Sequence, residues 1–282
     1  MFVYRRSFVA LLQFLAGTNM VIAACAGMSA AGILPYFGYP ADKNLAYFIF
    51  FGTLFTYNAQ RRIGDLHPIR EFSKTEWTLM AFAVVGMAFG IFELPNTEIV
   101  VLAISGALSI AYAYPFIPWG GRRLSLRRLP YIKLWLIVLV WMLSCVVAPM
   151  LQARTFLLEG HPLNPVFIIL QQGAFVAALT IPFDIRDIRD DFSSQRTLPQ
   201  VLGVDRSRRL ALLLLIVSAA AAFGLAIIGT VLRSAVAVHL VVCMVSAVVV
   251  SKATPSRHEL YYFIAVDGML LLQGLLFLLF LS

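Results

Sequence analysis

Four aspartates that directly follow a long apolar run are the strongest sign of chemistry in this sequence. They are Asp184, Asp187, Asp190 and Asp191. If the segment is helical, Asp184, Asp187 and Asp191 stand at i, i+3 and i+7 and share one face. Three carboxylates on one face repel each other unless a positive charge lies between them. A Mg²⁺ ion would supply it, because this cation binds one or two carboxylates together with substrate phosphates.

Arginines alternate with and follow these aspartates. Arg186, Arg189 and Arg196 carry guanidinium groups, which pair well with phosphate oxygens. The alternative is a solvated, salt-bridged helix end, which an Arg186–Asp190 pair at i, i+4 would satisfy. Because the cluster adjoins an apolar run, where ionisable groups are costly, we favour a functional site.

A second polar segment ends an earlier apolar run and holds Asn58, Arg61, Arg62 and Asp65. Asn58 lies within the run, where its amide needs a hydrogen-bonding partner. Basic residues at the end of a membrane span are common anchors, so the arginines alone are weak evidence. The two segments resemble each other in composition, and a bundle that brings them together would form one site.

The elements that position these residues are predicted to cross a membrane. Of the 282 residues, 61% are hydrophobic and 13% are charged, whereas a soluble domain has about 25% charged residues. Apolar runs of roughly twenty residues match the thickness of a bilayer, and helices satisfy their own backbone there. Nine such runs are predicted, at 8–31, 44–58, 76–94, 97–114, 131–151, 165–183, 208–231, 234–250 and 259–281.

The distribution of basic residues predicts the orientation. With a cytoplasmic N-terminus, all but three of the 22 Lys and Arg fall in cytoplasmic segments, the exceptions being Lys43, Arg154 and Arg233. The sequence therefore predicts an all-α, polytopic membrane protein with nine transmembrane helices and its N-terminus in the cytoplasm. The net charge of +8 is attributed to loops that face anionic lipid, and no nucleic-acid partner is expected.

Two polar residues interrupt the last apolar run. Asp267 and Gln273 lie at lipid depth. We expect Asp267 to belong to a packing network in which it pairs with an arginine or a tyrosine. A proton relay is the alternative, because ionisable groups inside membranes often carry function.

With these residues in view, the sequence resembles the UbiA superfamily of intramembrane prenyltransferases. The aspartate-rich segment after the sixth run, with Thr197-Leu198 and Leu202-Gly203 behind it, is similar to the second motif of that family. The turn at Tyr112–Phe116 is similar to its Tyr-Pro turn. The first motif departs from the family pattern: Asn58 matches, but Ala59, Arg62 and Leu66 occupy its three aspartate positions.

The resemblance implies a single UbiA-like domain over residues 1–282. Its implied activity is transfer of a polyprenyl group from a prenyl diphosphate to a lipophilic acceptor, such as an aromatic ring, at the cytoplasmic side of the membrane with Mg²⁺. The implied catalytic residues and metal ligands are Asp184, Asp187 and Asp191. The implied substrate-binding residues are Asn58, Arg61, Arg62, Asp65, Arg186, Arg196, Tyr57, Tyr112 and Tyr114.

The degenerate first motif leaves alternatives open. Arg61 and Arg62 would neutralise phosphate in place of a metal, or the chain is a catalytically silent lipid- or isoprenoid-binding or scaffold protein of the same fold. A transporter is a third reading, and a weaker one, because the polar residues gather at one face instead of the midplane. Membrane lipid is the other expected partner, and a bacterial inner membrane the expected location.

Overall fold

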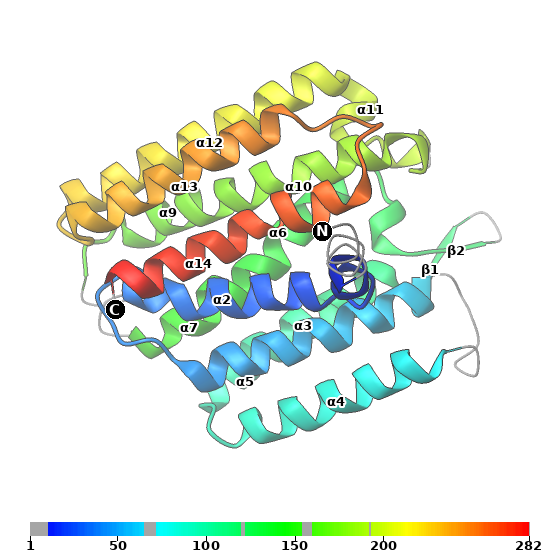
Figure 1. The fold of residues 1–282 in the computed structure, drawn as a ribbon, viewed down its shortest axis with the longest axis horizontal. Coiled ribbons are helices and arrows are strands. Elements are labelled where there is room, and N and C mark those ends of the chain that lie inside the picture. The colour runs from blue at the N-terminus through cyan, green and yellow to red at the C-terminus, as the bar shows by residue number, and fades with distance from the viewer. Residues whose placement is uncertain (1–10, 65–71, 120–121, 154–159, 192, 282) are drawn as a thin grey trace, which may run out of the picture.

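The computed structural model describes residues 11–64, 72–119, 122–153, 160–191 and 193–281. The chain folds into a bundle of long helices that run side by side (Figure 1). The α-helices are α2 (Met20–Tyr36), α3 (Lys43–Gly64), α4 (Lys74–Ile91), α5 (Asn96–Ala113), α6 (Ile132–Met142), α7 (Ala148–Met150), α9 (Asn164–Ile168), α10 (Ala174–Arg186), α11 (Leu198–Leu202), α12 (Val204–Ile227), α13 (Arg233–Ser251) and α14 (Gly268–Leu281).

Three π-helical segments interrupt the long helices. Leu143–Val147 joins α6 to α7, Ile169–Gly173 joins α9 to α10, and Tyr261–Val266 leads into α14. Such segments shift the facing of the residues after them and are frequent at functional sites. Short 3₁₀ turns lie at Leu126–Arg128, Leu151–Ala153, Asp187–Arg189 and Ser193–Gln195.

The helical membrane fold is confirmed. Among the described residues, six helical stretches are long and apolar enough to cross a bilayer, or seven if the bent pair Leu11–Gly17 and Met20–Tyr36 is one span. The six are Asn96–Ala113, Ile132–Ala153, Asn164–Arg189, Val204–Ile227, Arg233–Ser251 and Tyr261–Leu281. The number of nine spans and the cytoplasmic N-terminus stay predictions.

Two local features differ from the sequence prediction. The first run is broken instead of straight: Leu11–Gly17 and Met20–Tyr36 meet at an angle of 72°. Asn19 adopts a left-handed conformation with φ 61°, which asparagine tolerates better than most residues. The predicted loop at 115–130 contains a hairpin, in which β1 (Ile117–Trp119) pairs antiparallel with β2 (Arg122–Leu124).

Helix α2 packs closely against α3 and α14. At Gly32, an added Cβ would lie 2.8 Å from the Cα of Gly274, and an added Cβ at Gly274 would overlap the backbone of Met28. The backbones of α2 and α14 are therefore in direct contact, as small residues permit between membrane helices. This contact holds the last helix rigidly against the centre of the bundle.

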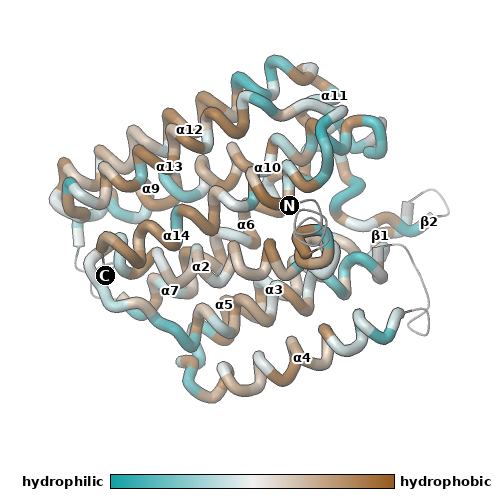
Figure 2. Tube along the Cα trace, in the orientation of Figure 1, coloured by the Kyte–Doolittle hydropathy of each residue, from teal (hydrophilic) through white to brown (hydrophobic). Residues whose placement is uncertain are grey.

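Polar residues gather at the ends of the bundle, whereas the long helices are mainly hydrophobic along their length (Figure 2). The hairpin, α11 and the connection from α13 to α14 lie at one end, and the C-terminus lies at the other (Figure 1). These three described segments belong to loops that the charge distribution assigns to the cytoplasm, and α10 also ends near them. The candidate site lies there.

Candidate active site

Lys133, in the first turn of α6, lies among the three aspartates. Its Nζ is 3.0 Å from Asp184 Oδ1, 3.7 Å from Asp187 Oδ2 and 2.7 Å from Asp191 Oδ2. The side chains of Lys133 and Asp184 are 12% and 2% exposed. The positive charge that three convergent carboxylates require is therefore an ammonium group of this chain. This role of Lys133 was not among the predictions, although a lysine just inside an apolar run is itself an unusual signal.

The backbone around the cluster brings distant segments together. The α-helical condition for the spacing of the aspartates holds only as far as Arg186, where α10 ends. Beyond it the chain tightens into a 3₁₀ turn, in which the Asp187 carbonyl accepts from the N–H groups of Asp190 and Asp191. Gln200 Nε2 donates to the Asp191 carbonyl at 3.0 Å, which ties α11 to this turn. The tighter turn folds Asp191 back toward Asp184, so that both reach Lys133.

The loop that follows the cluster also fixes the start of α6. The N–H of Tyr131 donates to the carbonyl of Gln195 at 3.1 Å, and Tyr131 itself has a left-handed φ of 65°. Lys133 comes two residues later. Its position among the aspartates is therefore set by a backbone contact between two segments that are far apart in the sequence.

Arg186 is held between a carboxylate and an aromatic cluster. Its Nε donates to Asp187 Oδ1 at 2.6 Å and its Nη2 to Asp187 Oδ2 at 3.2 Å. Its guanidinium lies 5.1 Å from the ring centre of Phe183, 5.5 Å from that of Tyr262 and 5.3 Å from that of Phe263. Cation–π contacts and a two-point ion pair together restrict the orientation of this group. Within the described chain, the alternative Arg186–Asp190 pair does not form.

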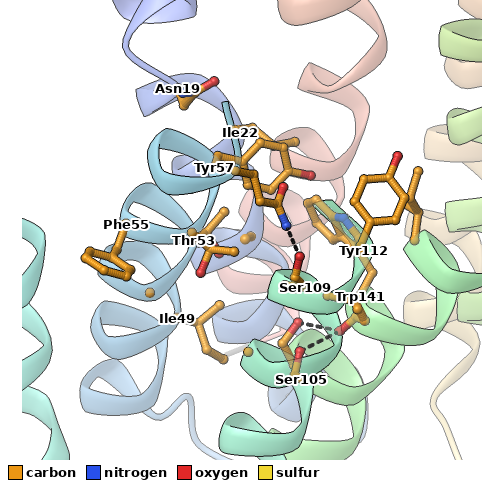
Figure 3. A pocket seen from close by; sticks show the side chains of 18 of the residues that line it. Asn19, Ile22, Ile49, Thr53, Phe55, Tyr57, Ser105, Ser109, Tyr112 and Trp141 are labelled. Carbon is orange, nitrogen blue, oxygen red and sulfur yellow. Dashed lines mark hydrogen bonds between the residues drawn. The ribbon is translucent and has the colours of Figure 1, made fainter. Parts of the chain in front are cut away.

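A chamber of about 590 Å³ opens next to these charges. Lys133, Arg186 and Asp187 line one part of it, and most of the rest comes from α2, α3, α4, α5, α6, α10 and the stretch Tyr261–Leu281. Figure 3 shows Tyr57, Tyr112 and Trp141 around the space. The volume lies within the range of about 300–1,000 Å³ that is usual for ligand pockets.

Several polar groups of the wall bond to backbone carbonyls and so leave the surface largely apolar. Ser105 and Ser144 donate to the Val140 carbonyl at 3.2 and 2.8 Å. Thr180 donates to the Val176 carbonyl at 2.8 Å. Gln60 Nε2 donates to the Ser109 carbonyl at 2.6 Å. A long hydrocarbon chain would find few unmet polar groups along these parts of the wall.

Of the predicted substrate-binding residues Tyr57, Tyr112, Tyr114 and Arg196, only the first two lie at the chamber. Tyr57 and Tyr112 line the chamber, as predicted for its wall. Tyr114 is 44% exposed and lies outside the lining. Arg196 is exposed, and its Nη1 lies 3.5 Å from the hydroxyl of Tyr131. The structure therefore does not bring Tyr114 or Arg196 to the chamber.

The second polar segment supports the bend of the first helix. The Nδ2 of Asn58 donates to the carbonyls of Thr18 and Leu54 at 3.2 and 2.8 Å, and its Oδ1 accepts from Asn19. Arg61 donates to the Gly17 carbonyl at 2.8 Å. Asn58 and Arg61 are outside the chamber lining. The side chain of Arg62 and all of Asp65 lie outside the described residues.

The carboxylate cluster has the oxygen donors that Mg²⁺ prefers, but not an open position for it. Lys133 Nζ lies within 3.0 Å of both Asp184 and Asp191, where a shared cation would sit. In the part of the chain that is described, no three acidic, histidine or cysteine side chains are grouped to hold a metal ion. The arrangement therefore does not fit a Mg²⁺ ion held by these carboxylates alone.

The fold and the site together define a class of protein: a multi-pass membrane protein with a charged cluster beside an apolar chamber that has aromatic side chains in its wall. The chain belongs to the UbiA prenyltransferase family, whose model matches residues 67–266. That membership confirms the resemblance and supports assignment as a prenyltransferase.

Two solved structures share the fold. The structure of a digeranylgeranylglyceryl phosphate synthase is 13% identical, with a TM-score of 0.55, and the match covers 96% of this chain and 98% of that one. The apo structure of a UbiA homolog from Aeropyrum pernix K1 is 14% identical, with a TM-score of 0.57, over 93% of this chain and 98% of that one. No curated protein matches the sequence significantly.

Proposed function

We propose that this protein transfers a polyprenyl group from a prenyl diphosphate to a lipophilic acceptor, such as an aromatic ring, at the cytoplasmic side of a bacterial inner membrane. The observation that carries the proposal is the junction of charge and hydrocarbon surface: Lys133 and Arg186 line a chamber whose remaining wall is mainly apolar and aromatic. A prenyl diphosphate has the same division into an anionic head and an apolar chain. A single domain over residues 1–282 belongs to the same proposal.

The donor would bind with its diphosphate at the charged end and its chain among the aromatic side chains. An ammonium and a guanidinium group stabilise the negative charge that gathers on the diphosphate as the allylic C–O bond breaks. Tyr57, Tyr112 and Trp141 line the chamber, and aromatic faces stabilise positive charge on the prenyl carbon. A chamber that excludes water protects that carbon from hydrolysis.

The charge balance of the cluster bears on the proposed magnesium assistance. Asp184, Asp187 and Asp191 bring three negative charges, against one each from Lys133 and Arg186. An anionic diphosphate that enters this site meets a net negative charge from these five groups. Added positive charge would offset it, so dependence of activity on Mg²⁺ is part of the proposal.

The test is an assay of transfer in lipid nanodiscs. Purified protein is supplied with allylic diphosphates of several lengths and a membrane lipid extract, and mass spectrometry detects prenylated products and released diphosphate. We expect the double variant Asp187→Asn plus Asp191→Asn to lose transfer. Asp205→Asn is the matched control, because Asp205 is exposed and pairs with Arg208 on α12. Full transfer by the double variant, or no diphosphate release by the wild type with any donor, would refute the proposal.

A catalytically silent isoprenoid-binding protein is the second candidate. The observation that favours it is the use of Asn58 and Arg61 to bond the backbone near the bend at Asn19, outside the chamber. Under this alternative, the protein retains a labelled prenyl diphosphate or isoprenoid during purification but releases no diphosphate and forms no product in the same assay.

A further inference from the structure

Asp267 is a chamber-lining carboxylate that the proposed donor site does not use. It lines the chamber and is 6% exposed. Asp187, which also lines the chamber, is bound by Arg186 and Lys133. Among the described residues, the carboxylate of Asp267 has neither a hydrogen bond nor an ion pair. Arg186 acts on it only through space, so the expected direct pairing with an arginine or a tyrosine does not form. An unpaired carboxylate in an apolar chamber is costly, which points to a ligand group that meets it.

The backbone holds Asp267 in one orientation. It directly follows the π-helical segment Tyr261–Val266, and its N–H donates to the Tyr262 carbonyl, five residues earlier, at 3.0 Å. The thiol of Cys25 donates to the Asp267 carbonyl at 3.1 Å, and the hydroxyl of Ser29 donates to the Leu270 carbonyl at 3.3 Å. Each added residue in a helix turns the following side chains by about 100°, so the π segment changes which residues face inward.

We propose that Asp267 is the base that accepts the proton of the acceptor during transfer. This inference rests on the proposed function and names the class of acceptor: a lipophilic molecule with a hydroxyl group. In this class the hydroxyl oxygen is itself alkylated, or the hydroxyl is conjugated to the carbon that is alkylated. That hydroxyl donates a hydrogen bond to the Asp267 carboxylate. The backbone carbonyl of Asp267 accepts a hydrogen bond from Cys25 of α2. The charged groups at the diphosphate end, Lys133 and Arg186, come from α6 and α10.

The step balances as a substitution. The allylic C–O bond of the donor breaks, and its electron pair leaves with the diphosphate. The acceptor atom forms a new bond to the prenyl carbon, and the proton that it must lose moves from the acceptor hydroxyl to an Asp267 oxygen. Positioned general bases contribute about 10²–10⁴-fold to such steps.

The test compares Asp267→Asn with the wild type and with Asp205→Asn in nanodiscs. Binding of a fluorescent prenyl diphosphate and transfer to extracted acceptors are measured separately. We expect Asp267→Asn to bind the donor within about twofold of the wild type and to lose transfer by about 10²-fold or more. Asp205→Asn is expected to match the wild type in both measurements.

A second variant guards against a folding defect and reports on the proton transfer itself. Asp267→Ala is assayed with increasing formate, a small carboxylate that fits the space of the lost side chain. We expect formate to restore part of its transfer and to leave the wild type unchanged. A purely structural role for Asp267 would not give this rescue.

The outcomes separate the two proposals. If the wild type releases no diphosphate with any donor, the proposed function fails. If the wild type transfers and Asp267→Asn transfers equally well, the function stands and the role of Asp267 is overturned. Loss of donor binding in Asp267→Asn, or absence of formate rescue in Asp267→Ala, also overturns it.

Discussion

Replacement of Lys133 by methionine removes the positive charge from the centre of the aspartate cluster while keeping a similar side-chain length. Lys133 Nζ lies 3.0 Å from Asp184 and 2.7 Å from Asp191. With an effective dielectric constant of about 20, each contact corresponds to about 5–6 kcal/mol of Coulomb attraction. The cost of taking the ions out of water offsets much of this, and removal of one partner of a buried pair typically costs about 3–5 kcal/mol.

Most of that loss should come from Asp184, which is the most buried of the three aspartates. We therefore expect Lys133→Met to lower the free energy of unfolding by about 3–5 kcal/mol. The double variant Lys133→Met plus Asp184→Asn should recover a large part of it, because the uncompensated buried charge is gone. Asp184→Asn alone should cost less than Lys133→Met, since Lys133 keeps its contact with Asp191.

The measurement is unfolding in mixed micelles by denaturant titration, followed by tryptophan fluorescence and analysed as a double-mutant cycle. Lys252→Met is the control, because Lys252 is exposed at the C-terminal end of α13. It should change the free energy of unfolding by less than about 1 kcal/mol. The reasoning is refuted if Lys133→Met unfolds like Lys252→Met, or if the double variant is no more stable than Lys133→Met alone.

Three further predictions concern packing, donor binding and the metal. Gly274→Ala should destabilise the bundle by at least about 1–3 kcal/mol, because its Cβ would overlap the Met28 backbone. Gly268→Ala on the same helix is the control: its Cβ meets nothing within 4 Å, so the change should be neutral or stabilising. The unfolding curves of the two variants check this, and equal destabilisation would contradict it. Arg186→Lys keeps the positive charge but should raise the KM for the prenyl diphosphate, because lysine cannot make the two-point contact with Asp187. An unchanged KM would count against a role for Arg186 in donor binding. Removal of Mg²⁺ by a chelator should abolish transfer by the wild type, with activity returning on titration of Mg²⁺; full activity in the chelator would show that Lys133 and Arg186 suffice for the diphosphate.

The location of helices and the presence of a charged cluster could be predicted from the sequence, because both depend on residues close together in the chain. Lipid forces each spanning segment to satisfy its own backbone, so an apolar run is enough to predict a helix. Asp184, Asp187 and Asp191 all approach the Lys133 ammonium group, and Tyr57 and Tyr112 line the chamber. Their roles in metal and substrate binding stay predictions. The family resemblance rested on the same local motifs.

The contacts between segments that are far apart in the sequence were decided by the tertiary structure. Lys133 meets the aspartates because the start of α6 is bonded to the loop after them, and Asn58 turns to the backbone near a bend at Asn19 that hydropathy does not reveal. Asp267 faces the chamber because a π segment precedes it and α2 bonds to its carbonyl. Hydropathy measures only how apolar a segment is. The rotation of each helix, and so the partner of each buried charge, is set by packing between helices.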